Sequence, residues 1–205
     1  MAIKMKYVLA SKNAHKAEEI RAILGGDYEI ITQTDAGAGD IEVIEDGKTF
    51  EENAVKKAVQ IMQATGLPAI ADDSGLAVDA LNGAPGIYSA RFAGKDATDE
   101  ENLQKLLREL EDVTLDKRQA KFVCVIAIAV PESNEVKTYR GECAGRLLTE
   151  KRGENGFGYD PIFYVEKYDC SMAQLESHIK NAISHRSNAL RLLCKDEVTE
   201  IFHID

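Results

Sequence analysis

The chain alternates between two patterns of apolar residues, one typical of strands and one typical of helices. Stretches rich in apolar residues predict five strands, at 5–10, 28–32, 69–71, 121–130 and 136–148. The last two are predicted to form a hairpin. Between the first four strands, apolar residues recur every three or four positions, as on one face of a helix. This order of elements predicts an α/β fold with a mixed sheet.

The ends of the predicted helices carry their own signals. Asn13 can cap a helix whose apolar stripe ends at Gly25–Gly26. A second helix, predicted to end at Thr65–Gly66, has one apolar stripe, made of Phe50, Ala54, Ala58 and Ile61. A last helix is predicted from His185 to about Cys194. In a capping box, a hydroxyl residue and a Glu or Gln three positions later bind each other's amides. Three such boxes are Thr49–Glu52, Thr98–Glu101 and Ser171–Gln174.

The organisation of the chain is simple. An acidic, glycine-containing loop is predicted over 34–47, before the second helix. No low-complexity tract, linker or repeat of solenoid period interrupts the sequence. We therefore predict a single domain spanning residues 1–205.

Composition and charge exclude some classes of function. Thirty-five acidic residues against 25 basic ones give a formal charge of -10, which argues against a bulk nucleic-acid binder. A small anionic ligand stays compatible, because a few Lys and Arg with a metal can reverse the field inside a cleft. The four cysteines form no C-x-x-C, and no apolar run approaches the roughly 20 residues that span a bilayer. We expect reduced thiols in a soluble cytoplasmic protein with no membrane partner.

Asp72–Asp73–Ser74–Gly75 carries the strongest chemical signal. Two adjacent carboxylates follow an apolar strand, and burying an unpaired carboxylate costs several kcal/mol. In α/β sheets, ligands collect beyond the carboxyl ends of strands. Successive strand side chains point to opposite faces, so Asp72 and Asp73 are expected to do different jobs. The plainer interpretation is a turn at the strand end with both acids in solvent.

Two further segments suit a phosphate and a hard cation. Ser11–Lys16 lies between a strand and a helix, where free amides and a lysine favour phosphate. An ordinary helix cap with a solvated lysine explains the same residues. Glu45 and Asp46, before the second helix, suit a hard cation or simply complement the helix dipole.

Two segments near the end of the chain suit a base or an anion. The glycines of Gly153–Pro161 allow close backbone approach, and its aromatic residues can stack on a base. A tight turn around two core aromatics is the alternative. Ser184–His185–Arg186, with Lys180 upstream, puts cations at a helix start, against the dipole. Such a placement favours a ligand-facing role over a merely structural one.

Together these stretches resemble the inosine triphosphatase family, the pyrophosphatases of non-standard purine nucleoside triphosphates. The matching segments, in the family's order, are Leu9–Glu19, Glu45–Ala54, Ile70–Leu76, Gly83–Arg91, Gly156–Phe163 and Ser184–Leu190. Lys12 departs from the pattern, since many members have a small or neutral residue there.

The resemblance implies an activity and a fold. The activity is hydrolysis of ITP, dITP and XTP between the α- and β-phosphates, which yields a monophosphate and pyrophosphate and requires Mg²⁺. The fold is a long, twisted mixed β-sheet flanked by helices in two lobes around a central cleft, usually in a homodimer.

The resemblance also implies roles for individual residues. Glu45 and Asp73 would hold the metal, and Asp73 would orient or deprotonate the attacking water. Lys57 and Lys180 would join Ser11–Lys16 around the phosphates, and His185 with Arg186 would read the base. The full set of implied substrate contacts is Ser11, Lys12, Asn13, Ala14, His15, Lys16, Lys57, Ser74, Phe157, Gly158, Tyr159, Asp160, Lys180, His185 and Arg186, with Arg91 as a further candidate.

Two other function classes stay open. A phosphomonoesterase with an aspartyl nucleophile also needs paired acids, but usually with one residue between them, whereas Asp72 and Asp73 are adjacent. A nucleotide-binding protein without catalytic activity would use the same glycine-rich and basic segments.

Overall fold

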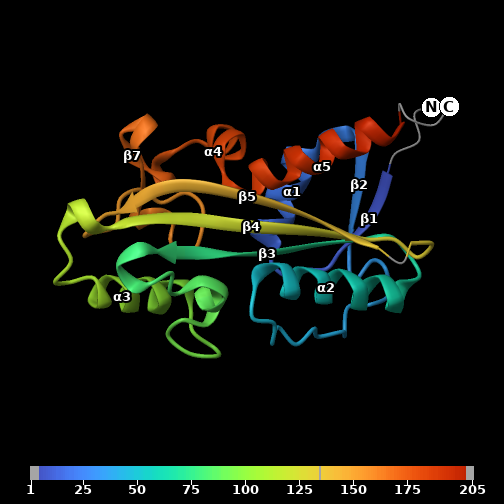
Figure 1. Ribbon diagram of the computed structural model, residues 1–205, viewed down its shortest axis with the longest axis horizontal. Coiled ribbons are helices and arrows are strands. Elements are labelled where there is room, and N and C mark those ends of the chain that lie inside the picture. Colours follow the sequence, from blue (N-terminus) through green and yellow to red (C-terminus); the bar gives the residue numbers. More distant parts are fainter. Residues whose placement is uncertain (1–4, 134, 202–205) are drawn as a thin grey trace. The chain divides into compact units, whose positions relative to one another are not determined.

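A seven-stranded mixed sheet forms the centre of the fold. The computed structural model describes residues 5–133 and 135–201. The sheet order is β2-β1-β3-β4-β5-β6-β7 (Figure 1). The strands are β1 Met5–Leu9, β2 Tyr28–Thr32, β3 Ala69–Val78, β4 Gln119–Ala129, β5 Val136–Leu147, β6 Phe163–Val165 and β7 Cys170–Ser171. The helices are α1 Ala14–Leu24, α2 Phe50–Thr65, α3 Asp99–Glu109, α4 Ser177–Ile183 and α5 His185–Ile201.

The pairing of the strands confirms the mixed sheet. β1 pairs in parallel with β2 and with β3, whereas β6 pairs antiparallel with β5 and β7. The α/β class predicted from the order of elements is therefore confirmed. Within the described residues, no helix is both long and apolar enough to cross a membrane.

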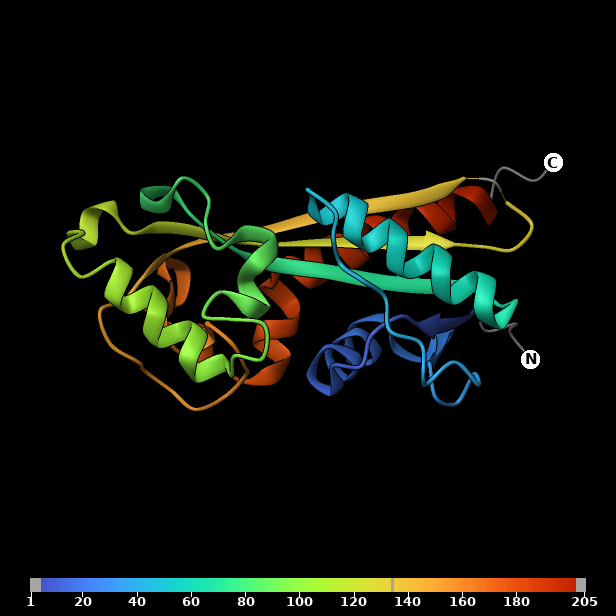
Figure 2. The same ribbon diagram turned by 90° about the horizontal axis from the view of Figure 1, so that it is seen from below.

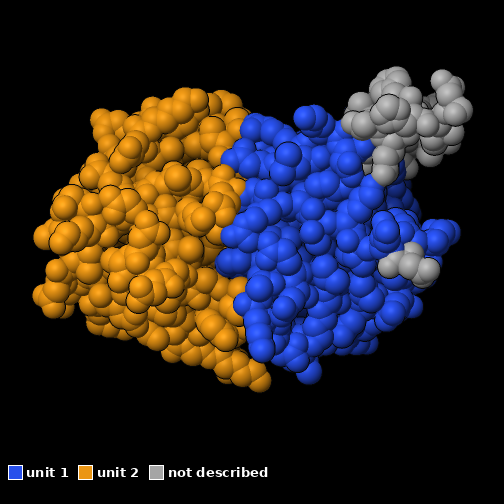
Figure 3. Space-filling model, in the orientation of Figure 1, with its two compact units in different colours: residues 1–73, 124–141, 186–205 blue, residues 74–123, 142–185 orange. Residues whose placement is uncertain are grey.

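The chain divides into two compact units (Figure 3). Within the described residues, unit 1 comprises 5–73, 124–133, 135–141 and 186–201, and unit 2 comprises 74–123 and 142–185. Unit 1 carries α1, α2 and α5, and unit 2 carries α3 and α4. The single domain and the central cleft expected from the sequence stay predictions.

The helices of unit 1 cover both faces of its part of the sheet. α1 and α5 lie on one face and α2 lies on the other (Figures 1 and 2). Ile20 of α1 and Leu190 of α5 join Leu9, Ile70 and Ile126 in one buried cluster. This arrangement means that neighbouring residues of β3 face different helices.

The predicted ends of α1 and α2 are confirmed. The Asn13 Oδ1 accepts from the Lys16 amide at 3.1 Å, as expected for a helix cap. Gly66 ends α2 with φ 66°, a conformation that favours glycine. The predicted apolar stripe of α2 is buried, comprising Phe50, Ala54, Ala58 and Ile61.

Two of the three capping boxes are reciprocal, and one is not. Thr98 with Glu101 forms a complete box, and so does Ser171 with Gln174, which opens only a three-residue 3-10 helix. At α2, the Thr49 hydroxyl accepts from the Glu52 amide at 3.1 Å, but the Glu52 carboxylate accepts from the Lys48 amide at 2.6 Å. The prediction that the Thr49 amide donates to the Glu52 carboxylate was wrong, because that carboxylate binds the amide of Lys48, one residue earlier.

The predicted lengths of β3 and of α5 were also wrong. The strand expected to end at residue 71 continues to Val78, so Asp72 and Asp73 lie inside β3 and not in a turn after it. Both acids are buried, which excludes the plainer interpretation of a solvated strand end. α5 continues to Ile201, beyond the expected end near Cys194.

Arg118 joins three segments of unit 2 through their backbone carbonyls. Arg118 is only 3% exposed, and its guanidinium donates to Leu110 O at 2.5 Å, Val113 O at 2.9 Å and Leu148 O at 3.2 Å. Leu110 and Val113 follow α3, so the cation also faces the negative end of that helix. The Leu110 carbonyl also accepts from the Val113 amide at 2.9 Å, so Arg118 adds a second donor there and a charged donor to the carbonyls of Val113 and Leu148.

Replacing Arg118 with methionine is expected to lower the free energy of unfolding by about 2–4 kcal/mol, because two buried carbonyls and one partly buried carbonyl lose a charged donor. The exposed Arg108 on α3 is the matched control, and Arg108→Met is expected to cost less than about 0.5 kcal/mol. Urea denaturation of the two variants measures the difference. Equal losses would show that the three carbonyl bonds contribute nothing specific.

Candidate active site

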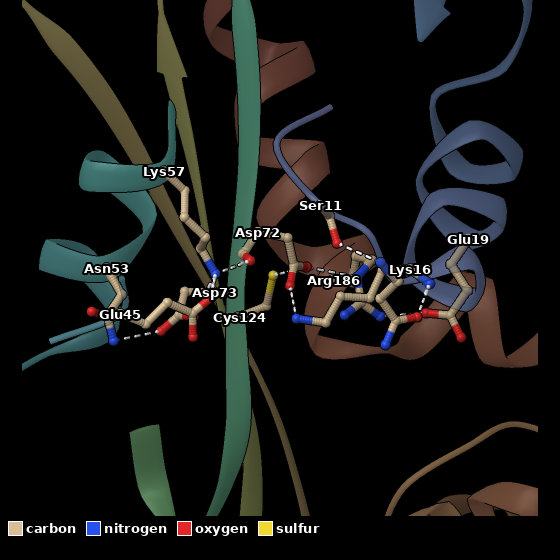
Figure 4. Close-up of polar contacts among 11 residues, drawn as sticks. Ser11, Lys16, Glu19, Glu45, Asn53, Lys57, Asp72, Asp73, Cys124 and Arg186 are labelled. Atoms are coloured by element: carbon tan, nitrogen blue, oxygen red, sulfur yellow. Dashed lines mark hydrogen bonds and ion pairs between the residues drawn. The ribbon is translucent and has the colours of Figure 1, made fainter. Parts of the chain in front are cut away.

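Asp72 and Asp73 point to opposite faces of β3, as predicted from their adjacency. Figure 4 shows Asp72 toward Lys16 and Arg186, and Asp73 toward Lys57 and Asn53. The side chains of Asp72 and Asp73 are 0% and 8% exposed. Each needs partners of its own, because burial disfavours an isolated charge.

Asp72 lies in a cluster in which the named charges balance. Its Oδ1 is 2.6 Å from Lys16 Nζ and its Oδ2 is 2.7 Å from Arg186 Nε. Arg186 also pairs with Glu19, and the Cys124 thiol donates to Asp72 Oδ2 at 3.2 Å. Burial alone would raise the pKa of Asp72, but Arg186 and Lys16 outweigh it and hold that pKa well below its ordinary value.

Arg186 therefore contacts carboxylates in this structure. It is 1% exposed, and both Asp72 and Glu19 bind its guanidinium. The base-reading role that the resemblance implies for Arg186 stays a prediction. Glu19 ends the first matched segment but was assigned no role from the sequence, although it lies one helical turn after Lys16 and can share its face. The sequence did not indicate a role for Cys124, because this residue lies in a continuous run of apolar residues.

Asp73 lies in a second cluster, which Lys57 holds together. The Lys57 ammonium is 2.8 Å from Glu45 Oε1, 2.7 Å from Asp73 Oδ1 and 2.9 Å from the backbone oxygen of Asp72. These three acceptors match the three donors of an ammonium group. The structure thus brings together Glu45, Lys57 and Asp73, which the resemblance assigned to metal and phosphate binding.

The pKa values of Lys57 and Asp73 in this second cluster are both raised, but for different reasons. Burial raises the pKa of Asp73 above its ordinary value, and the Lys57 ammonium offsets only part of that rise. Burial would lower the pKa of Lys57, but Asp73 and Glu45 together raise it. A buried carboxylate with a raised pKa, beside a charge partner, is typical of a group that handles protons.

The charges of the second cluster leave room for a cation. Glu45 and Asp73 carry two negative charges against the one positive charge of Lys57. Mg²⁺ is commonly held by one or two carboxylates and completes its shell with water and phosphate oxygens. Across residues 5–133 and 135–201, no three His, Cys, Asp or Glu side chains come together for a metal. The donor set therefore fits Mg²⁺ bound with a phosphate ligand better than a metal caged by protein alone.

Asn53 is a further polar residue of this cluster. Its side chain is fully buried on α2, and its Nδ2 is 3.4 Å from Asp73 Oδ2. It was not assigned a role from the sequence, where it stands inside a matched segment without a chemical signal of its own. Only its place one turn before Lys57 on the same helix indicates the shared face.

The Ser11–Lys16 segment, called the Ser11–Lys16 loop below, leaves the carboxyl end of β1 and includes the first residues of α1, as expected. The Ser11 hydroxyl accepts from the Asn13 amide at 3.2 Å, and Lys12, Ala14 and His15 are exposed. A pocket of about 450 Å³ beside the loop is lined by Ser11, Lys12, Asn13, Ala14, Ala17, Glu18, Arg21, Thr32, Gln33, Thr34 and Gly39. The pocket thus lies at the ends of two parallel strands and the start of a helix, where anions commonly bind.

The glycine-rich loop of unit 2 is organised by Asp160. Its carboxylate is 2.5 Å from Lys180 Nζ and accepts from the Phe157 amide at 3.0 Å. A side chain on Gly156, which has φ 76°, would place its Cβ 2.1 Å from Asp160 Oδ2. The Lys180 ammonium lies 4.7 Å from the Phe157 ring centroid. Asp160 and Lys180 thus fix the position of the half-buried Phe157 within the loop.

The remaining candidates of unit 2 are held by neighbouring side chains and backbone. Tyr159 is buried and donates its hydroxyl to Ser89 O at 2.9 Å, and burial raises the pKa of that phenol. The Gly158 amide donates to Asp99 at 2.8 Å. His185 stacks on Phe122 with ring centroids 4.8 Å apart. The sequence did not indicate this partner, because Phe122 lies within the apolar residues of a strand.

The candidate residues thus fall into two groups. Ser11–Lys16, Glu45, Lys57, Asp73 and Arg186 belong to unit 1. Those of unit 2 are Ser74 on β3, Phe157, Gly158, Tyr159, Asp160, Lys180, His185 and Arg91, whose guanidinium lies 5.2 Å from the Tyr88 ring centroid. That the two groups serve one substrate stays a prediction.

Comparisons with known proteins agree with these observations. A model described as the Ham1 family matches residues 7–196. A dITP/XTP pyrophosphatase of Desulfotalea psychrophila is 53% identical over 184 residues, which cover 89% of this chain and 81% of that protein. A dITP/XTP pyrophosphatase of Bacillus cereus is 49% identical over 197 residues, 95% of each chain. The structure of the Staphylococcus aureus Ham1 protein is 47% identical with a TM-score of 0.85, covering 95% of this chain and 99% of that one.

The lowered pKa of Asp72 predicts a pH-dependent contribution to stability. A depressed pKa in the folded state means that this contribution is complete above the ordinary value of 3.8 and is lost as the pH falls through the folded pKa. At pH 7, Asp72→Asn is expected to cost about 3–5 kcal/mol, because two buried cations lose their partner. The cost should shrink below about pH 4, because the unfolded chain then takes up a proton at Asp72 and the ionised folded state gains less free energy over it.

Urea denaturation between pH 3 and pH 7 checks this expectation. The exposed Asp79, one residue after β3, supplies the matched control Asp79→Asn, whose small effect should not depend on pH in this way. A cost of Asp72→Asn that stays constant down to pH 3 would contradict the assignment.

Proposed function

Because the chain belongs to the Ham1 family, we propose that it hydrolyses non-standard purine nucleoside triphosphates such as dITP and XTP to the monophosphate and pyrophosphate. The family membership confirms the resemblance found in the sequence. The proposal is carried by relatives named dITP/XTP pyrophosphatase that are about half identical along almost the whole chain. The buried cluster of Glu45, Lys57 and Asp73 supports the hydrolytic part of the proposal.

Asp73 acts as the general base in this proposal. It is buried, its pKa is raised, and Lys57 and Asn53 hold its two oxygens in place. A base is most effective when its pKa lies near the working pH, and burial moves Asp73 in that direction. The carboxylate takes a proton from the water that attacks the α-phosphorus, and pyrophosphate leaves.

Glu45 and Asp73 hold the Mg²⁺ that this activity requires. When bound, the cation draws charge from the phosphate oxygens and makes the phosphorus easier to attack. The surplus negative charge of the two carboxylates over Lys57 supports this assignment. Lys57 limits the repulsion between the carboxylates before the cation arrives.

The phosphates are bound by the Ser11–Lys16 loop, and the base is bound by unit 2. The loop offers the amides at the start of α1 and the ammonium of Lys16, which is 17% exposed although it pairs with Asp72. Phe157 offers a ring for stacking, and His185 offers ring N–H groups for an acceptor on the base. We further expect a cytoplasmic homodimer, which analytical ultracentrifugation and cell fractionation can test.

A panel of nucleoside triphosphates tests the proposal directly. ITP, dITP and XTP are expected to exceed ATP and GTP in kcat/KM by at least about 10², because a site built to donate to O6 leaves buried donors unpaired with adenine. Guanine shares O6, so its 2-amino group is expected to be the feature that is rejected. Both products are identified, with Mg²⁺ and with EDTA.

Pyrophosphate should be the first product, and EDTA should stop its release. Orthophosphate as first product would favour the phosphomonoesterase alternative. Tight binding of the panel without turnover would favour a nucleotide-binding protein that lacks catalytic activity. Equal hydrolysis of ATP and ITP would refute the base-reading role of His185.

Replacing Asp73 with asparagine removes the base and one metal ligand while preserving the shape of the side chain. Turnover is expected to fall by about 10² or more, the usual contribution of a positioned acid–base group. Asp79→Asn again serves as the control, because Asp79 is exposed beyond the end of β3. Circular dichroism verifies the fold of both variants. A folded Asp73→Asn variant with near-normal kcat would remove Asp73 from the mechanism.

A further inference from the structure

The side chain of Asn53 links two segments that are far apart in the sequence. Its Oδ1 accepts from the backbone amide of Gly47 at 2.8 Å, and its Nδ2 donates to Asp73 Oδ2 at 3.4 Å. Asn53 itself is 0% exposed on the first turns of α2. One buried amide group therefore joins the loop before α2 to the middle of β3.

The loop that Asn53 contacts also carries Glu45. Residues 41–47 adopt no regular secondary structure, so contacts from α2 determine where Glu45 lies. These contacts run from Lys57 to Glu45 at 2.8 Å, from Lys56 to Asp46 at 2.5 Å and from Asn53 to Gly47 at 2.8 Å. Lys56 and Asp46 are exposed or half-exposed, and such pairs contribute little, so the two partly buried contacts from Lys57 and Asn53 matter most.

Gly47 is required for the close approach of the loop to α2. A Cβ at this position would lie 2.6 Å from Asn53 Oδ1 and 2.9 Å from Glu52 Cβ. The loop backbone is thus pressed against the Asn53 amide with no room for a side chain. The glycine and the asparagine form one fitted contact.

Among side chains of this size, only asparagine suits both partners. The Gly47 amide needs an acceptor, and the Asp73 carboxylate needs a donor. Aspartate would place a second negative charge against Asp73, and alanine or leucine would leave the Gly47 amide and one carboxylate oxygen without this partner. The two arms of Asn53 match the polarity of the two groups they meet.

We propose that Asn53 is a positioning residue that holds the Glu45 loop and the Asp73 carboxylate in register, so that both bind one divalent cation. The proposal rests on the proposed function only through the assignment of Glu45 and Asp73 as metal ligands. Residues that orient metal ligands through hydrogen bonds typically contribute about 10- to 100-fold to metal affinity or activity. Asn53 is in position to do so for both ligands at once.

Binding of Mn²⁺ to the protein in the presence of pyrophosphate, which supplies phosphate oxygens as ligands, tests this role without any turnover. Titration calorimetry is run on the wild type, Asn53→Ala, Gly47→Ala and the control Asn102→Ala. Asn102 is also buried on a helix and also binds loop backbone, donating to Ala90 O at 3.1 Å and accepting from the Ala93 amide at 2.7 Å, but in unit 2. It therefore reports the structural cost of removing a buried asparagine.

Asn53→Ala is expected to weaken Mn²⁺ binding about 10- to 100-fold, while Asn102→Ala leaves it within about twofold of the wild type. Gly47→Ala should also weaken Mn²⁺ binding, because its Cβ pushes the Glu45 loop away from Asn53 although Asn53 itself is unchanged. The double variant should lose less than the product of the two single losses, because the clash with the amide is relieved. The Mg²⁺ concentration for half-maximal hydrolysis should rise in Asn53→Ala, and high Mg²⁺ should restore much of its kcat.

The possible failures are distinct. Wild-type affinity for Mn²⁺ in a folded Asn53→Ala variant would overturn the positioning role and leave the proposed hydrolysis intact. If Asn53→Ala does not fold, unchanged Mn²⁺ affinity in Gly47→Ala overturns the role equally. A wild type that binds no Mn²⁺ would overturn the metal assignment, and with it this proposal. A wild type that binds Mn²⁺ normally but hydrolyses no member of the nucleotide panel would overturn the proposed function alone.

Discussion

Two adjacent carboxylates buried inside one strand are the constraint on which the surrounding structure depends. Removing a carboxylate from water is strongly unfavourable unless cations and donors replace the lost hydration. Because β3 sends Asp72 and Asp73 to opposite faces, no single cation can serve both side chains. Lys16 and Arg186 come from α1 and α5 on one face, and Lys57 comes from α2 on the other. The placement of these helices is thus tied to the charge of the strand they cover.

The two faces divide stability from chemistry. On the Asp72 face, the named charges sum to zero, and the pKa of Asp72 is held well below its ordinary value. A carboxylate that stays ionised is a poor proton acceptor, so Asp72 is suited to fixing Lys16 and Arg186. On the Asp73 face, the carboxylates outnumber the cation and the pKa of Asp73 is raised. A site with a surplus of negative charge and a more basic carboxylate suits a cation and a proton transfer.

The sequence predicts local features well and long-range partners poorly. The Asn13 cap, the ends of α1 and α2 and the opposite faces of Asp72 and Asp73 follow from short-range rules of spacing, and all are confirmed. The predicted length of β3 was too short because acidic residues are unfavourable in strands. Asp72 and Asp73 are tolerated there because the distant Lys16, Lys57 and Arg186 pair with them. Cys124 and Asn53 were missed for the same reason, since their roles depend on contacts 52 and 20 residues away.

Lys57 shows how the second cluster can change while the fold stays fixed. All three donors of its ammonium are engaged by Glu45, Asp73 and the backbone of Asp72, so a phosphate contact requires that one acceptor leave. Two of these acceptors belong to β3 and are fixed by the sheet. Glu45 lies on an irregular loop with a side chain 32% exposed, so its bond to Lys57 is the one that can be exchanged. Once that bond is exchanged, the buried contact between Gly47 and Asn53 keeps the loop close to Asp73. Under the proposed function, the loop therefore releases Lys57 to the substrate without carrying Glu45 away from its partner carboxylate.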